Sequence, residues 1–163
     1  MVMTFKGLAK LIEEIGELAQ VVGKKIAYMT GDHPDGKGDL DLRIQSEVGD
    51  VIAAIRFVSE KMKLDKINID AIAGYKTTGT ILNGLPDLAR NLGTLSYSAS
   101  NAMCVIHEDR QVVDEGGSLQ YQMGLSLASM NFVAKSLNLD RQAIAARAAR
   151  KVWQYEAWDR QKP

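Results

Sequence analysis

Residues 7–18 read GLAKLIEEIGEL, and residues 84–95 read GLPDLARNLGTL. Five of the twelve aligned positions are identical, and two of those five are glycines. In both segments leucine or isoleucine recurs every three or four residues, which is the spacing of one face of an α-helix. Two such similar amphipathic helices, one near the start of the chain and one just past its middle, indicate an internal repeat.

The similarity extends well beyond these two helices. Residues 43–65 align without a gap to residues 118–140, with seven identities in 23 positions, and the register continues as far as Lys76 and Lys151. In the first half the apolar spacing predicts helices over about 4–28, 44–62 and 66–76, with Thr4 as the first N-cap. We therefore predict an all-α helical bundle in a single domain, 1–163. It is a degenerate tandem repeat of a three-helix unit, with repeat one at 4–80 and repeat two at 82–160.

Four glycines occupy matching positions inside the predicted helices: Gly16, Gly49, Gly93 and Gly124. A glycine inside a helix costs about 1 kcal/mol of stability relative to alanine. Glycine at the same unfavourable position in both repeats predicts close approach between helix backbones.

Composition excludes several classes of protein. The 20 basic residues balance the 20 acidic ones, so no positive excess is available to bind nucleic acid. No apolar run approaches the roughly 18 residues that span a bilayer, so no membrane partner is expected. Cys104 is the single cysteine and cannot form an internal disulfide, which favours a reducing compartment and a cytoplasmic location.

Acidic residues gather in two short motifs, EEIGE at 13–17 and EVGD at 47–50. Residues three apart share one face of a helix, so each motif presents two carboxylates together. If the two helices pack antiparallel, Glu14, Glu17, Glu47 and Asp50 converge. Four such charges repel one another, and a hard cation such as Mg²⁺ or Mn²⁺ would offset that repulsion through oxygen ligands.

The alternative is that these acids are ordinary solvated charges on helix surfaces. The second repeat argues against it, because it keeps the glycines and apolar positions but has no carboxylate at the matching sites, which are Arg90, Asn91, Thr94, Gln122 and Leu125. The fold therefore does not need the acids, and a functional role is favoured.

EExxE on one helix followed by ExxD on the next resembles the all-α nucleoside triphosphate pyrophosphohydrolase superfamily, which includes the MazG-like enzymes and the dimeric dUTPases. The gap between Glu17 and Glu47 is slightly longer than in the common pattern, and the excess lies in the Gly- and Asp-rich segment. The resemblance implies Mg²⁺-dependent hydrolysis of a (d)NTP to the (d)NMP and pyrophosphate. It implies these roles: metal ligands Glu14, Glu17, Glu47 and Asp50, a supporting or water-activating Glu13, and a phosphate contact at Lys76.

The resemblance also implies a homodimer, as do apolar stripes wide enough to need further burial. Two other functions stay open: a non-catalytic helical binding or oligomerisation module, and a phosphoribosyl-ATP pyrophosphohydrolase. The Gly- and Asp-rich segment 30–39 is either a substrate lid or a solvated connector. Two C-terminal groups are more typical of a solvated basic face and of helix packing than of phosphate contact and base stacking. They are Arg147, Arg150, Lys151 and Arg160, and Trp153, Tyr155 and Trp158.

Overall fold

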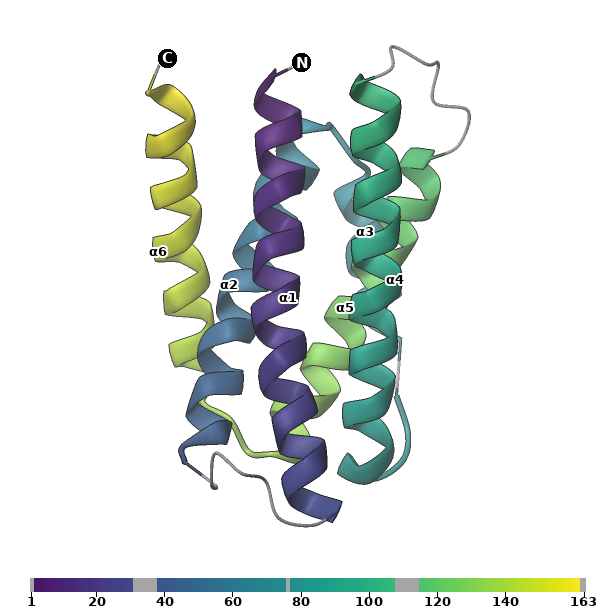
Figure 1. Ribbon diagram of the computed structural model, residues 1–163, viewed down its shortest axis with the longest axis vertical. Coiled ribbons are helices and arrows are strands. Elements are labelled where there is room, and N and C mark those ends of the chain that lie inside the picture. Colours follow the sequence, from purple (N-terminus) through teal and green to yellow (C-terminus); the bar gives the residue numbers. More distant parts are fainter. Residues whose placement is uncertain (1, 31–37, 76, 108–114, 162–163) are drawn as a thin grey trace.

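The computed structural model describes residues 2–30, 38–75, 77–107 and 115–161, and within them the regular structure is entirely helical (Figure 1). Six helices follow one another along the chain: α1 (Val2–Thr30), α2 (Leu40–Lys61), α3 (Lys66–Ala73), α4 (Ile81–His107), α5 (Glu115–Ser136) and α6 (Arg141–Arg160). The predicted all-α class is confirmed.

Helix boundaries differ from the predicted ones at several ends. Thr4 lies inside α1 rather than at its N-cap, because the helix already begins at Val2. Asp65 caps α3 by accepting a hydrogen bond from the Asn68 amide at 3.1 Å. The predicted third helix is shorter than expected, because α3 ends at Ala73. Segment 103–117 contributes the end of α4 and the start of α5, and residues 108–114 lie outside the described part.

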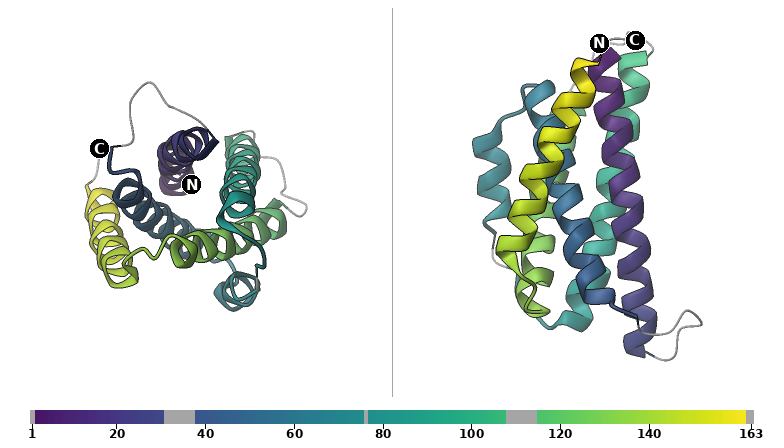
Figure 2. Two further views of the ribbon diagram at one scale, coloured as in Figure 1. Left: turned by 90° about the horizontal axis from the view of Figure 1, so that it is seen from below. Right: turned by 90° about the vertical axis from the view of Figure 1, so that its left-hand side faces the viewer.

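The helices pack in a pattern that exchanges partners between the two halves of the chain. The first helices of the halves, α1 and α4, lie side by side, and each packs against its own second helix, α2 or α5. The third helices cross over, since α6 packs against α2 while α3 packs against α5 (Figure 2). The third helix beside α2 therefore comes from the far end of the chain.

Two hydrogen bonds fix these crossed contacts in the same way. Gln45 Oε1 on α2 accepts from the backbone amide of Asp140 at 2.8 Å, and Gln120 Oε1 on α5 accepts from the amide of Asp65, also at 2.8 Å. Gln45 aligns with Gln120, and Asp65 aligns with Asp140, so donors and acceptors are matched positions of the two halves. Each glutamine thereby holds the residue that precedes the other half's third helix.

The matched glycines divide into two kinds. A Cβ atom on Gly49 would lie 3.1 Å from the Cβ of Arg147, and one on Gly124 would lie 2.6 Å from the Cβ of Ile72, so both admit close packing by a third helix. Gly16 and Gly93 would meet nothing within 4 Å. The predicted close approach is confirmed for Gly49 on α2 and Gly124 on α5 and is wrong for Gly16 on α1 and Gly93 on α4.

The apolar stripes meet in one core along the length of the bundle. On α1 the stripe from Leu8 to Val22 is at most 3% exposed, and on α4 the stripe from Leu85 to Leu95 is at most 1% exposed. A single copy of the chain buries these stripes, so they give no reason to expect a dimer. Among the described residues, none of the helices is both long enough and apolar enough to cross a membrane.

Candidate metal centre

Three of the predicted ligands come together between α1 and α2. Glu14 on α1 and Glu47 and Asp50 on α2 each place a carboxylate oxygen within 4.8 Å of the others, and we call these three residues the carboxylate cluster. The two helices run antiparallel, as the prediction required (Figure 1). Glu14 and Asp50 are 0% and 1% exposed, whereas Glu47 is half-buried. Two helices thus place three acids where water is largely excluded.

The remaining predicted acids on α1 lie outside this cluster. Glu17 is exposed, but its charge is close enough to contribute to the raised pKa of Glu47. Glu13 is also exposed and pairs with Lys10 at 2.8 Å. Lys76 falls outside the described residues, and so does most of the predicted lid, 31–37.

A bidentate ion pair from α6 holds Asp50. Arg147 Nε donates to Asp50 Oδ1 at 2.8 Å, and its Nη2 donates to Oδ2 at 2.6 Å. The neighbouring Gly49 makes this geometry possible, because its hydrogen leaves room for α6, whose Ile144 carbonyl would lie 3.2 Å from a Cβ there. The glycine thus sets the distance at which a third helix meets α2.

Glu14 is surrounded by three donors. Tyr155 donates its hydroxyl proton to Glu14 Oε1 at 2.7 Å, and the ammonium groups of Lys10 and Lys151 lie 3.0 and 3.6 Å from the same oxygen. Lys151 also lies 3.3 Å from Asp50 Oδ2 and so bridges the two helices. The basic side chains around the cluster are therefore Lys10, Arg147 and Lys151.

Two oxygens of the cluster are left without a partner among the described residues. Glu14 Oε2 and Glu47 Oε2 are both buried, and neither forms a hydrogen bond. A buried polar atom without a partner costs about 1–3 kcal/mol, and more when it is charged. Such atoms call for an explanation, and a role in binding a cation is one of the recognised ones.

The pKa values of the two glutamates in the cluster are shifted in opposite directions. Burial raises the pKa of Glu14, but the hydrogen bonds from Tyr155 and Lys10 and the nearby ammonium charges outweigh it, so its pKa lies below the ordinary value. The pKa of Glu47 lies above the ordinary value because of burial first, and then because of the charges on Glu17, Asp50 and Glu14. Glu47 is therefore the carboxylate whose charge is least compensated.

Sequence reasoning did not assign Arg147, Lys151, Tyr155 or Lys10 to this site. Arg147, Lys151 and Tyr155 are spaced by four residues and so share one face of α6, which was a usable signal. The repeat alignment also matched Lys151 to Lys76. The prediction placed the basic helix of the site in the same half of the chain, whereas α6 is the helix that packs against α2.

The matching positions of the second half are neutral. Asn91 aligns with Glu14. Its side-chain Nδ2 donates to Ser129 Oγ at 2.6 Å, and its backbone carbonyl oxygen accepts from Ser126 Oγ at 3.3 Å. Leu125 aligns with Asp50, and Ile72 aligns with Arg147. An apolar pair thus stands where the first half has an ion pair, so packing of a third helix does not depend on that ion pair.

A cavity of about 630 Å³ adjoins the cluster between α1 and α6. Lys10, Lys151 and Tyr155 line it, and all three contact Glu14 on their other side. A second cavity, of about 640 Å³, is lined by α2, α3, α5 and α6 and includes none of the predicted ligands. Neither cavity is lined by Glu14, Glu47 or Asp50, but the cavity beside α1 shares Lys10, Lys151 and Tyr155 with the surroundings of the cluster.

The described part of the chain is all-helical, and its carboxylate cluster is in contact with three basic side chains, those of Lys10, Arg147 and Lys151. Comparisons with protein-family models, with curated proteins and with solved structures find no match to this chain.

Proposed function

We propose that this protein is a Mg²⁺-dependent nucleoside triphosphate pyrophosphohydrolase, which converts a (d)NTP and water to the (d)NMP and pyrophosphate. The observation that carries the proposal is the convergence of Glu14, Glu47 and Asp50, with two buried oxygens that lack a partner. The resemblance of the two acidic motifs supplies the reaction class. It also supplies Glu17 as a fourth ligand.

The energetics of the cluster support a functional origin. Three buried or half-buried carboxylates repel one another, and the pKa of Glu47 is raised first by burial and then by the charges on Glu17, Asp50 and Glu14. The aligned residues Asn91, Gln122 and Leu125 are neutral, so the same helix packing does not require charge there. Sites that retain an unfavourable arrangement of charge are commonly functional.

The residues fit a hard divalent cation. Mg²⁺ prefers carboxylate oxygens and retains waters that can be exchanged for substrate phosphate oxygens. The unpartnered oxygens of Glu14 and Glu47 are available as ligands, and Asp50 becomes available when Arg147 moves off it. When bound, Mg²⁺ would supply Lewis acidity at the phosphate oxygens and lower the pKa of a coordinated water.

The basic side chains would then take a second role. Arginine forms bidentate hydrogen bonds with phosphate as readily as with carboxylate, and lysine binds phosphate as a point charge. If Asp50 and Glu14 held a cation, Arg147 and Lys151 would be available to bind and orient the phosphate chain. Tyr155 keeps Glu14 in place through its hydroxyl, and the buried walls of α1 and α2 limit the access of water to the site.

The paired contacts support a repeat with exchanged third helices. The two glutamine–amide bonds, and the crowded glycines Gly49 and Gly124, recur at aligned positions of the two halves. We propose that repeat one supplies the carboxylates while repeat two supplies the basic third helix, so that neither half forms the site alone. The homodimer and the cytoplasmic location stay predictions.

A metal titration combined with an activity assay tests the proposal. Millimolar Mg²⁺ or Mn²⁺ is expected to raise the melting temperature of the wild type and to leave that of Glu47→Gln unchanged. Glu60→Gln is the matched control, because Glu60 lies on the same helix with a side chain that is 64% exposed. A panel of NTPs and dNTPs with Mg²⁺ should yield pyrophosphate. No thermal shift and no pyrophosphate from any nucleotide would exclude the proposal.

One observation favours the non-catalytic helical module. Asp50 already has both oxygens bonded to Arg147, and Glu14 Oε1 already has three donors, so much of the cluster is neutralised within the protein. On that alternative the ion pairs serve only to hold α6. Mg²⁺ would then leave the melting temperature unchanged even in Arg147→Met, in which Asp50 is released.

A further inference from the structure

The cavity between α1 and α6 has different chemistry at its two ends. At the inner end Lys10 and Lys151 lie against the carboxylate cluster. At the outer end stand Lys6 and Trp158, near the end of the bundle at which α1 begins and α6 finishes. Two turns of α6 separate Lys151 from Trp158, a rise of about 10 Å at roughly 1.5 Å per residue. A ligand that fills this cavity would therefore meet two lysines at one end, and one lysine and an aromatic ring at the other.

The charge of the cavity wall suits an anion. Three lysines line it against one carboxylate, that of Glu13, which gives a formal balance of +2 (3 minus 1) in a chain whose net charge is zero. In the absence of a ligand, the ammonium groups of Lys10 and Lys151 lie on Glu14 and Asp50. Lys10 and Lys151 would be available to bind phosphate if the carboxylates had another counter-ion.

Trp158 has an exposed surface at the outer end. Its residue is 41% exposed, so part of the indole ring is accessible to a ligand in the cavity that it lines. Lys6 Nζ lies over its ring, 5.7 Å from the centroid. An exposed cation–π contact is worth about 0.5–1 kcal/mol, whereas stacking of a base on an aromatic ring is worth about 1–3 kcal/mol. A nucleobase can therefore displace Lys6 from the ring.

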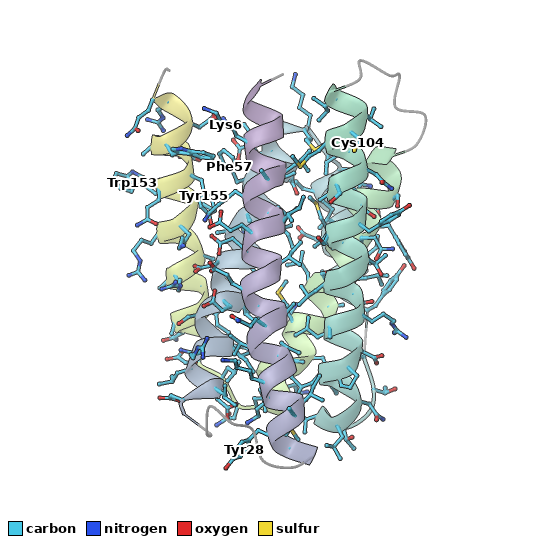
Figure 3. The ribbon with its side chains drawn as sticks, in the orientation of Figure 1. Lys6, Tyr28, Phe57, Cys104, Trp153 and Tyr155 are labelled. Carbon is cyan, nitrogen blue, oxygen red and sulfur yellow. The ribbon has the colours of Figure 1, made fainter. Side chains whose placement is uncertain are left out.

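The side chains along α6 divide between the two faces of the helix. Figure 3 shows Lys6 and Tyr155 between α1 and α6, whereas Trp153 points away from α1. Trp153 is 68% exposed and does not line the cavity. The two tryptophans of the chain can therefore be compared in an experiment, because Trp158 lines the cavity and Trp153 does not.

We propose that this cavity is the nucleotide pocket of the protein, with the base stacked on Trp158 and the phosphates held by Lys10 and Lys151 beside the cluster. This inference rests on the proposed function for the direction of the phosphate chain. It extends that function by assigning the side chain that binds the base and the two lysines that bind the phosphates. Lys6 moves off the ring and pairs with the bound anion.

Fluorescence of Trp158 tests the stacking without any turnover. In Trp153→Phe only Trp158 reports, and titration with AMP in the presence of Mg²⁺ should quench it saturably. Inorganic pyrophosphate should compete with AMP without quenching. In the matched control Trp158→Phe, only Trp153 reports, and AMP should leave its emission unchanged. Equal quenching in the two variants, or none in either, would overturn the assignment.

Affinity measurements separate stacking from folding. By equilibrium dialysis, Trp158→Leu is expected to weaken AMP binding by about tenfold or more, the equivalent of at least about 1.4 kcal/mol, whereas Trp158→Phe should retain most of the affinity. Ribose 5-phosphate should bind all three proteins with similar affinity. If Trp158→Leu binds AMP as tightly as Trp158→Phe, the ring does not stack on the base.

Different results would reject the proposed pocket and the proposed reaction. Pyrophosphate release by the wild type, with the same KM in Trp158→Leu, would reject the pocket and leave the proposed function standing. Saturable quenching by AMP, with no pyrophosphate released from any nucleotide, would reject the reaction and leave the pocket standing.

Discussion

Arg147 on α6 and Asp50 on α2, which are 97 residues apart in the sequence, form a bidentate ion pair with donor–acceptor distances of 2.8 and 2.6 Å. Asp50 is almost fully buried, while the Arg147 side chain is 34% exposed. The pair therefore joins the acidic motif of one half to the third helix of the other.

Replacing Asp50 and Arg147 by the apolar residues at the aligned positions of the other half tests how much the ion pair contributes to stability. Arg147→Ile alone should destabilise the fold by about 3 kcal/mol, because it leaves Asp50 buried with only Lys151 nearby. The double variant Asp50→Leu/Arg147→Ile, which copies Leu125 and Ile72, should come within about 1 kcal/mol of the wild type or exceed it. Urea denaturation measures both. If the double variant is as unstable as the single one, the two halves are not equivalent in their packing.

Glu47→Gln should stabilise the protein at neutral pH in the absence of divalent metal. The folded pKa of Glu47 lies above its ordinary value of 4.5, so ionisation of Glu47 costs stability as the pH rises through that interval. We expect a gain of about 1 kcal/mol, or roughly 2–4 °C in melting temperature. The gain should be smallest at acid pH and should grow as the pH rises. A variant less stable than the wild type at pH 7 would show that Glu47 already has a compensating partner.

Tyr155→Phe should have the opposite pH dependence. Its hydroxyl stabilises the ionised form of Glu14, whose folded pKa is lowered, so this contribution is present at neutral pH and is lost as the pH falls through that pKa. Removing a hydrogen bond to a buried charge should cost about 1.5–3 kcal/mol at pH 7. Denaturation at pH 7 and at acid pH measures the difference, and Tyr97→Phe, at an exposed position, should have little effect at either. Because the ring and its contact with Phe57 are retained, a deficit independent of pH would show that the hydroxyl does not act through the charge on Glu14.

The matched glycines should respond differently to alanine. Gly93→Ala should stabilise the protein by up to about 1 kcal/mol, because a Cβ atom there meets nothing and alanine favours the helix. Gly124→Ala should destabilise it by about 1–3 kcal/mol, because the new Cβ would lie 2.6 Å from that of Ile72 and displace α3. Thermal melts of the two variants decide the point. Gains in both would mean that α3 shifts without cost.

Most of the secondary structure followed from local patterns. The three-and-four spacing of leucine and isoleucine predicted α1, α2 and α4, and the predicted stripe on α1 is buried, together with Glu14 and Val21. The ends were less well predicted, since Thr4 is internal and α3 stops at Ala73. Helix ends depend on single capping contacts, which leave a weaker trace in sequence than a repeating face.

The convergence of the carboxylates was predicted in part. EEIGE and EVGD correctly predicted that Glu14, Glu47 and Asp50 lie close together, because spacing on a helix and antiparallel packing of neighbours are short-range properties. The basic half was missed, because the sequence does not show which third helix packs against α2. Both α3 and α6 offer an apolar face, and the alignment gives each half a lysine at the matching position.

The sequence by itself determined the helical class, the faces that each helix buries and the location of the acids, since all of these are encoded within a few turns of chain. Only the tertiary structure decided that α6 lies beside α2, that Arg147, Lys151 and Tyr155 contact the carboxylates, and that Trp158 lines the same cavity as Lys10 and Lys151. The physical reason is that partner choice among similar amphipathic helices depends on the fit of whole surfaces. Gly49 and Gly124 show this, because each makes room for a helix that belongs to the other half of the chain.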